Sequence, residues 1–296
     1  MKSKRINYFK FFSLFFAIVV SVFIAGCTGV SPTAAIVTVT YNGNGNTAGT
    51  VPVDPSSPYE YGATVMVLGN TGGLTRINVG GTSYRLSGWN TKADGSGSGQ
   101  AEGSTFTIGV SNVTLYAQWT PYVLLDIGPA GGYIFYDKGN YYKADFTIIK
   151  AAPPVPITPT YSDWRYLEAA PSDQSTGVEW GCWGVLISGA DGTAVGTGEQ
   201  NTIDIEAGCA IPGTAADLCA NLVLGGYSDW FLPSKDELNL MYENLKVAEV
   251  GDFADFSYWS SSEYNASGAW NQHFSGGSQN PNGKNGTERV RAVRAF

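Results

Sequence analysis

Three segments near the end of the chain decide the fold: YWSSSE (258–263), AWNQHF (269–274) and RVRAVRAF (289–296). The second and third alternate between two kinds of side chain from one residue to the next, which is the period of a β-strand. Between them, residues 275–286 consist mainly of Gly, Ser, Asn and Gln. The sequence therefore predicts terminal strands joined by a polar segment rich in turns.

The alternation in 269–274 predicts which side chains face the core. Trp270 and Phe274 fall on one side of the strand, because successive side chains point to opposite faces. Asn271, His273 and Ser275 then fall on the solvent side. Polar side chains held on a packed scaffold are typical of a recognition surface. The candidate ligand-binding residues are Tyr264, Asn265, Asn271, His273, Ser275, Asn280, Asn282 and Asn285.

Residues 1–26 have the features of an export signal. Four basic residues precede the apolar run 11–24, which is too short for a comfortable membrane span. The run ends in Ile24-Ala25-Gly26-Cys27, which resembles a bacterial lipobox with Cys27 as the lipidated first residue. An ordinary signal peptide that ends near a Cys is the alternative. Acyl chains such as palmitate on Cys27, followed by the tether 27–34, would anchor the protein to a membrane.

The charge balance argues against nucleic acid and anionic lipid as partners. The chain has 17 Lys and Arg against 25 Asp and Glu, and removing residues 1–26 takes away four of the positive charges. Both kinds of partner need clustered positive charge, and the only basic cluster is Arg289, Arg291 and Arg294. The low charge and the 38 Gly suit a β-rich extracellular protein.

Residues 35–120 are predicted to be all β. Apolar residues alternate with polar ones in five short runs, and turn residues such as 42–45 (NGNG) separate the runs. The segments VTVTYNGNG (37–45), LSGW (86–89) and TLYAQW (114–119) resemble the Listeria–Bacteroides repeat, also called the internalin B-repeat. The resemblance implies a β-grasp-like module that acts as a surface spacer or an adhesion module. Residues 121–127 form the linker to a second domain, 128–296.

The second domain begins with the glycine-rich turn 128–132 (GPAGG), but its spacing does not fit a phosphate-binding loop. Four prolines in 144–160 indicate an extended inserted loop. Residues 181–205 are rich in Gly, Thr and Asp, and their acids lack the spacing of a calcium loop. A solvated loop is the prediction there.

Two helices are predicted after this loop. Thr214 with Asp217, and Ser234 with Glu237, have the spacing of helix-capping pairs. In the second helix Leu238, Met241, Tyr242 and Leu245 share one face. The opposite face of this helix is expected to be polar and to carry Asp236, Glu237, Asn239, Glu243 and Lys246.

The motif GYSDWFLPSKDEL (226–238), together with 258–263, Trp270 and VRAVR (290–294), resembles the C-terminal domain of the Legionella collagen-like adhesin. That family looks like the formylglycine-generating-enzyme branch of the C-type lectin fold. It is also similar to spirochaete surface lipoproteins whose lectin-like domain is diversified by retroelements. The resemblance implies an α+β domain with a ligand-binding face on its late strands. Asn-rich loops without any diversification explain the same residues equally well.

Two departures from these families limit what the resemblance implies. Calcium-dependent lectins carry Trp-Asn-Asp, whereas this chain has Trp270-Asn271-Gln272, so calcium-mediated sugar binding is not implied. Formylglycine-generating enzymes need a Cys pair near the C-terminus, whereas the last Cys here is Cys219. No catalytic residue, metal or cofactor is therefore expected.

The cysteines left after Cys27 are Cys182, Cys209 and Cys219, which allow one disulfide and leave one thiol over. All three pairings stay open, with Cys209–Cys219 slightly preferred because it closes the shortest loop. His273 is the only histidine, so a Cys–His catalytic arrangement would have to use it.

The leading hypothesis is a lipoprotein on the outer surface of a bacterial cell envelope, which binds an extracellular protein or glycan. An enzyme or carbohydrate-processing module on the same fold, and a purely structural envelope protein, are the alternatives.

Overall fold

The computed structural model describes residues 36–77, 82–139, 141–142, 148–149 and 164–296. The export signal, Cys27, the tether and most of the proline-rich insertion 144–160 lie outside these residues. Among the residues described, no helix is both long enough and apolar enough to cross a bilayer.

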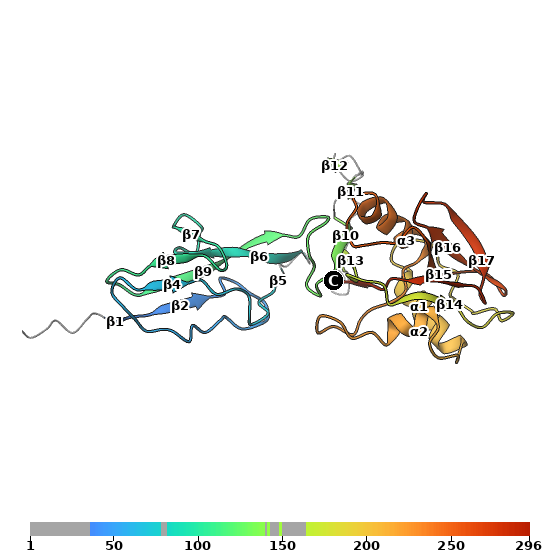
Figure 1. The fold of residues 1–296 in the computed structure, drawn as a ribbon, viewed down its shortest axis with the longest axis horizontal. Coiled ribbons are helices and arrows are strands. Elements are labelled where there is room, and N and C mark those ends of the chain that lie inside the picture. Colours follow the sequence, from blue (N-terminus) through green and yellow to red (C-terminus); the bar gives the residue numbers. More distant parts are fainter. Residues whose placement is uncertain (1–35, 78–81, 140, 143–147, 150–163) are drawn as a thin grey trace, which may run out of the picture. The chain divides into compact units, whose positions relative to one another are not determined.

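Residues 36–121 form short β-strands (Figure 1). The main sheet has the order β2-β9-β6-β5, in which β2 and β9 are parallel and β6 is antiparallel to β9. The strands are β1 (Ile36–Val37), β2 (Val39–Asn42), β3 (Tyr59–Glu60), β4 (Thr64–Met66), β5 (Arg76–Ile77), β6 (Ser83–Asn90), β7 (Gly99–Gln100), β8 (Thr105–Thr107) and β9 (Val113–Pro121).

The predicted strand alternation in this region is confirmed by burial. Val39 and Tyr41 face the core while Thr40 and Asn42 are exposed. Trp89 is buried, its ring centroid lies 4.7 Å from that of Tyr41, and its indole N–H donates to the Leu68 carbonyl at 2.9 Å. A buried Trp needs such a partner, so this pair fixes the centre of the hydrophobic cluster built from residues 37–119.

Residues 122–296 contain two larger sheets. A three-stranded sheet has the order β10-β13-β19, and a five-stranded sheet has the order β14-β18-β15-β16-β17. The strands are β10 (Tyr133–Asp137), β11 (Tyr141–Tyr142), β12 (Ile148–Ile149), β13 (Tyr166–Ala169), β14 (Ser175–Glu179), β15 (Ser257–Asn265), β16 (Gly268–His273), β17 (Gln279–Gly283), β18 (Thr287–Val290) and β19 (Val293–Ala295). The chain is thus α+β and mainly β, as predicted.

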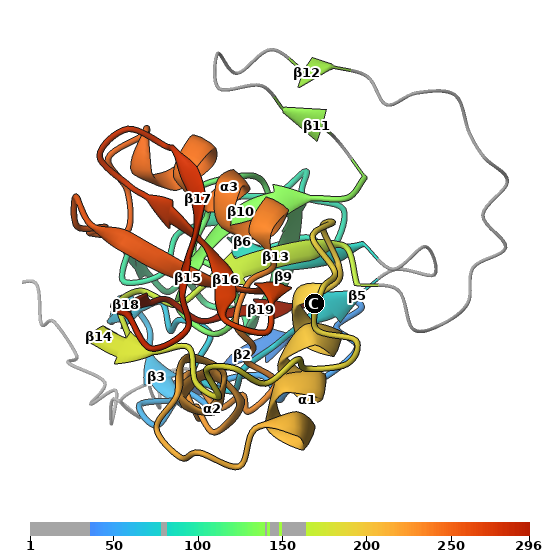
Figure 2. The ribbon, with the colours of Figure 1, turned by 90° about the vertical axis from the view of Figure 1, so that its right-hand side faces the viewer.

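Helices cover both sides of β15. In Figures 1 and 2, α3 (Lys235–Met241) lies on one side, and α1 (Gly198–Gly208) and α2 (Ala215–Ala220) lie on the other. One hydrophobic cluster contains Trp180 and Trp259 with residues of α1 and α2. The other contains Tyr258 and Phe274 with residues of α3. Both faces of the five-stranded sheet are therefore buried at its centre, and solvent reaches it at its edges.

Both predicted helix caps are confirmed. The Ser234 hydroxyl accepts from the Glu237 N–H, and the Glu237 carboxylate accepts from the Ser234 N–H at 2.7 Å. The Thr214 hydroxyl accepts from the Asp217 N–H. The π-helical turn η1 (Tyr242–Lys246) extends α3.

Glu237 was wrongly expected on the polar face of α3. Its side chain is buried and also accepts from the Gly196 N–H at 2.7 Å. Burial raises the pKa of this carboxyl to about 7, against the lowering effect of its backbone N–H donors. Glu237 therefore joins the preceding loop to the start of α3.

The prediction of a solvated loop over 181–205 was wrong at its end, because α1 begins at Gly198. The buried residues of this helix are Gly198, Asn201, Thr202 and Ile205. Only Ile205 among them is a large apolar residue, so the helical period is not visible as a hydrophobic pattern. Asn201 is instead held by bonds to the Gly192 carbonyl and the Ser261 hydroxyl.

The glycine-rich turn 128–132 holds a carboxylate of the chain itself. The N–H groups of Ala130 and Gly132 donate to Glu168 Oε1 at 3.1 and 2.7 Å. Glu168 is fully buried, and burial raises its pKa against the opposing effect of these donors. The turn therefore fixes the first strand of the second region, in agreement with the rejection of a phosphate loop.

We predict that fragments 35–120 and 128–296 each unfold in one cooperative transition. Residues Ile36–Phe296 group as one compact unit, but the cluster of 37–119 shares no residue with the clusters of 125–295. A separate core is what independent folding requires. Calorimetry of each fragment and of the whole chain would check this, and aggregation of 128–296 alone would show that the boundary is wrong.

Candidate binding surface

The ribbon of β16 and β17 holds most of the candidate residues at a fixed register. Asn271 lies opposite Asn280, Ala269 opposite Asn282, and Trp270 opposite Pro281. Residues directly opposite each other share a face. Asn271, Asn280 and Asn282 therefore lie on one face, which together with Glu288 we call the amide face. β17 is an edge strand whose three central residues, Asn280, Pro281 and Asn282, are exposed, whereas most of β16 is buried.

The amide face is organised by one carboxylate. Asn271 and Asn282 each donate from Nδ2 to Glu288 Oε1, at 3.1 and 2.7 Å. Asn280 and Asn282 are exposed. Asn271, predicted to be exposed, is only 7% exposed, because Glu288 of β18 lies against it. The amide face thus offers two exposed asparagines, Asn280 and Asn282, of which Asn282 shares the Glu288 carboxylate with the buried Asn271.

The opposite side of the ribbon carries Lys235, Tyr264, Trp270 and Pro281, which we call the aromatic face. The rings of Tyr264 and Trp270 meet edge to face at 5.3 Å. The Lys235 ammonium lies 4.1 Å from the Trp270 ring centroid. Tyr264 is 54% exposed, and it lies on this face rather than with the asparagines.

The burial predicted for Trp270 was wrong, while that for Phe274 is confirmed. Phe274 is fully buried, with its ring centroid 4.5 Å from that of Tyr258. Trp270 is only half-buried. Both lie on the α3 side, but Lys235 is the first residue of α3, so the helix covers Phe274 and leaves Trp270 at the margin of the core.

The other predicted residues lie in turns around the ribbon. His273 is half-buried, and its Nδ1 lies 2.8 Å from the Ser275 hydroxyl in the turn that follows β16. Asn265 Oδ1 accepts from the Ser267 N–H at 2.9 Å and so closes the turn between β15 and β16. Ser275 and Asn285 are exposed. Both hydrogen bonds join residues two positions apart, so His273 and Asn265 stabilise the turns at the ends of β16.

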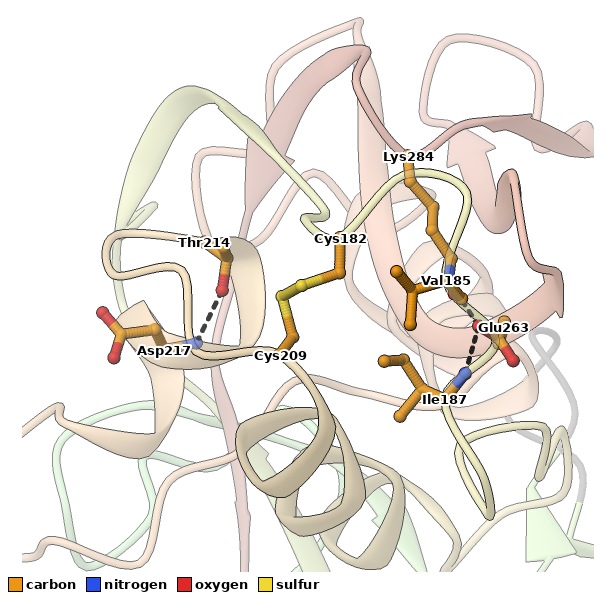
Figure 3. The surroundings of a disulfide bond; sticks show 8 residues. All are labelled: Cys182, Val185, Ile187, Cys209, Thr214, Asp217, Glu263 and Lys284. Carbon is orange, nitrogen blue, oxygen red and sulfur yellow. Dashed lines mark hydrogen bonds and ion pairs between the residues drawn. A yellow bond between two sulfur atoms is a disulfide. The ribbon is translucent and has the colours of Figure 1, made fainter.

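The preferred disulfide Cys209–Cys219 was wrong: Cys182 pairs with Cys209, with their Cα atoms 5.7 Å apart (Figure 3). Cys219 is free and fully buried in α2. Burial raises the pKa of its thiol, which disfavours the reactive thiolate. The shorter loop did not decide the pairing, because helix α2 directs Cys219 into the core.

A buried ion pair between Glu263 and Lys284 lies near the disulfide (Figure 3). Lys284 Nζ also donates to the Val185 carbonyl at 2.7 Å, and Glu263 Oε1 accepts from the Ile187 N–H at 2.9 Å. The pair thus ties the ends of β15 and β17 to the loop after Cys182. Sequence reasoning missed it, because Lys284 stands in a polar run that looks like a free loop.

The basic cluster near the C-terminus is neutralised internally. Asp173 binds both Arg289 and Arg291, at 2.8 and 2.6 Å. Arg294 forms a two-point contact with Asp229, with both distances 2.8 Å. These arginines therefore stabilise the end of the chain and do not form a free cationic surface. Within the described ranges, no three His, Cys, Asp or Glu side chains are placed to hold a metal ion.

Comparisons with known proteins agree with the resemblance drawn for the second domain. Residues 170–294 match the family model described as Lcl C-terminal domain. This match includes α1–α3, the five-stranded sheet and both faces of the ribbon.

Two proteins of Evansella cellulosilytica are also similar to the chain. One, named as a membrane protein, is 36% identical over 81 residues, which is 27% of this chain and 11% of that protein. The other, named as a Gly-rich membrane protein, is 56% identical over 36 residues, or 12% of this chain and 4% of that protein. The chain thus spans about a tenth or less of the length of these relatives.

A fimbrial protein from Bacteroides ovatus is a structural neighbour at 13% sequence identity and a TM-score of 0.37, with 88% of this chain and 70% of that chain covered. A score this low does not establish a shared fold.

Proposed function

We propose that the protein is a surface-anchored adhesin-like protein that binds an extracellular ligand with the β16–β17 ribbon. The observation that carries this proposal is the pair of exposed asparagines, Asn280 and Asn282, held at fixed register on an edge strand. The family match over 170–294 and the membrane-protein relatives support a place in the cell envelope. Ligand-binding residues are expected on such exposed, rigidly supported positions.

The proposed role is binding rather than catalysis. The only free thiol in the described residues, Cys219, is buried with a raised pKa. His273 contacts Ser275 in an exposed turn, and the chain has no second histidine. A nucleophile needs an adjacent base that is itself oriented by a third group, so these residues favour a recognition surface.

Residues 35–120 act, in this proposal, as the internalin-type spacer that their sequence resembles, and they hold the lectin-like domain away from the membrane. Exposed positions such as Asn280 and Asn282 on the edge strand, and Asn285 in the turn after it, are expected to tolerate substitution at little cost in stability. That tolerance is what a diversified recognition surface would require.

Cys27→Ser is expected to release the protein from the membrane, or to leave it unprocessed. The reason is the lipobox-like segment 24–27 after a basic and apolar leader, because an acyl chain on Cys27 would supply the anchor. Fractionation of cells, with mass spectrometry of the processed N-terminus, would check it. Membrane association identical to that of the wild type would contradict the lipid anchor.

The binding proposal is tested with a combined protein and glycan array probed by the full chain in detergent. Asn280→Ala and Asn282→Ala should each weaken the bound signal, while the free energy of unfolding stays within ~0.5 kcal/mol of wild type. Asn112→Ala is the matched control, because Asn112 belongs to residues 36–121, where its Oδ1 accepts from the Thr38 N–H. Ligand binding that survives both ribbon changes would place the site elsewhere.

A further inference from the structure

Lys235 differs from the other basic side chains of residues 164–296. Residues 164–296 contain seven Lys and Arg. Six of them form an ion pair with a carboxylate: Arg165, Lys246, Lys284, Arg289, Arg291 and Arg294. Lys235 forms no ion pair with the residues described, and its ammonium lies over the Trp270 ring instead. Within residues 164–296, Lys235 is therefore the cation that is left available for an external anion.

The position of Lys235 is fixed by its surroundings. Its backbone carbonyl accepts from Gln279 Nε2 at 2.7 Å, and its N–H donates to the Ser262 hydroxyl at 2.9 Å. The Lys235 ammonium lies over the Trp270 ring, and the half-exposed ring of Tyr264 packs against Trp270. A preorganised cation loses less conformational freedom when it binds, so this arrangement suits recognition of a single anionic group.

Other polar groups beside the aromatic face are already used within the protein. Gln272 Nε2 donates to Asn239 Oδ1 at 2.8 Å and to the Gly277 carbonyl at 3.0 Å. Gln279 Nε2 is bound to the Lys235 carbonyl and to Gln272 Oε1. A saccharide presents many hydroxyls that need partners. A peptide carboxylate with an apolar neighbour needs only a cation and an apolar surface.

We propose that the aromatic face binds an acidic peptide segment. A Glu or Asp carboxylate of that segment pairs with the Lys235 ammonium, and an adjoining apolar or aromatic side chain packs on Tyr264 and Pro281. The segment lies on the side of the ribbon that carries Trp270 and Pro281, opposite the side that carries Asn280 and Asn282. This inference rests on the proposed function, because it names the ligand class of the same ribbon.

The acidic net charge of the chain does not oppose this pairing at short range. The formal net charge is −8, but the Debye length is about 8 Å at physiological ionic strength. Distant acids are therefore largely screened, while the carboxylate and Lys235 would be in direct contact. An ion pair supported by an aromatic ring is stabilised further by the cation–π interaction that Lys235 already makes.

The test uses an array of short peptides that carry Glu beside Phe, each matched by the same peptide with Gln in place of Glu, and a parallel array of acidic oligosaccharides. The full chain in detergent should bind Glu peptides at least about fivefold more strongly than their Gln partners, a difference of ~1 kcal/mol. Lys235→Gln should remove this preference, and Lys235→Arg should keep most of it. Lys92→Gln removes the same charge from an exposed position in residues 36–121 and should change nothing.

Equal binding to Glu and Gln peptides, or a Glu preference that survives Lys235→Gln, would overturn the acidic-peptide inference alone. So would binding to the acidic oligosaccharides and to no peptide, which would leave the proposed function standing. Absence of any ligand on peptides, proteins and glycans would overturn the proposed function and the inference together. Because the Glu-versus-Gln comparison uses the unmodified protein, it decides the question even if the Lys235 variants fold poorly.

Discussion

Glu263→Ala is expected to lower the free energy of unfolding by about 3–5 kcal/mol, because it leaves a buried ammonium without its counter-charge. The side chains of Lys284 and Glu263 are 0% and 3% exposed. Without Glu263, Lys284 keeps only the Val185 carbonyl and the face of the Trp180 ring. The Ile187 N–H also loses its acceptor. Urea denaturation of the full chain measures the change as a lower midpoint at unchanged slope.

The double variant Glu263→Gln with Lys284→Met is the control for this prediction. It removes both charges at nearly constant volume, and replacing a whole buried pair is often close to neutral. We therefore expect the double variant to be more stable than Glu263→Ala. A loss below about 1 kcal/mol in Glu263→Ala would show that Lys284 reaches solvent and that the pair is not buried in solution.

Phe274→Ala is expected to cost about 3–5 kcal/mol, the usual range for an aromatic residue removed from a core. Its ring contacts those of Tyr242, Phe253 and Tyr258, with centroid distances of 5.6, 5.1 and 4.5 Å. Trp270→Ala should cost less, because Trp270 is half-buried at the core margin. Chemical denaturation of both variants tests the assignment of the two faces. A larger loss for Trp270→Ala than for Phe274→Ala would contradict this assignment. It would show that Trp270, and not Phe274, is the side chain packed in the core.

Local sequence rules predicted several elements correctly. Ser234 with Glu237 gave the start of α3, because a capping box uses only neighbouring residues. The alternation around Val39 and Tyr41 gave the buried face of β2. Phe274 was placed in the core for the same reason. In each case the signal lies within a few residues of the element that it defines.

The failures depend on contacts between residues far apart in the chain. Asn271 is buried because Glu288 of β18 reaches it, and strand period alone does not include a second strand. Glu237 is buried because the loop at Gly196 closes over it. Helix α1 packs small and polar residues inward, so it has no hydrophobic stripe to detect. The disulfide follows the direction in which α2 points Cys219, which loop length does not reveal.

The candidate surface shows the same division. The sequence placed the asparagines on late strands, and the register brings Asn280 and Asn282 to one exposed face. The sequence grouped Tyr264 with these asparagines, whereas in the structure Tyr264 packs on Trp270 on the opposite side of the ribbon. It also missed Lys235, which comes from α3 and reaches the ribbon only through the fold. A Lys beside a helix cap carries no sequence signal for that contact.

Amide hydrogen exchange of the full chain, with and without a ligand identified on the arrays, tests the central claim most directly. If the β16–β17 ribbon is the binding element, the ligand should slow exchange in residues 264–288 and leave residues 36–121 unchanged. Protection confined to residues 36–121, or to helices α1 and α2, would contradict the account.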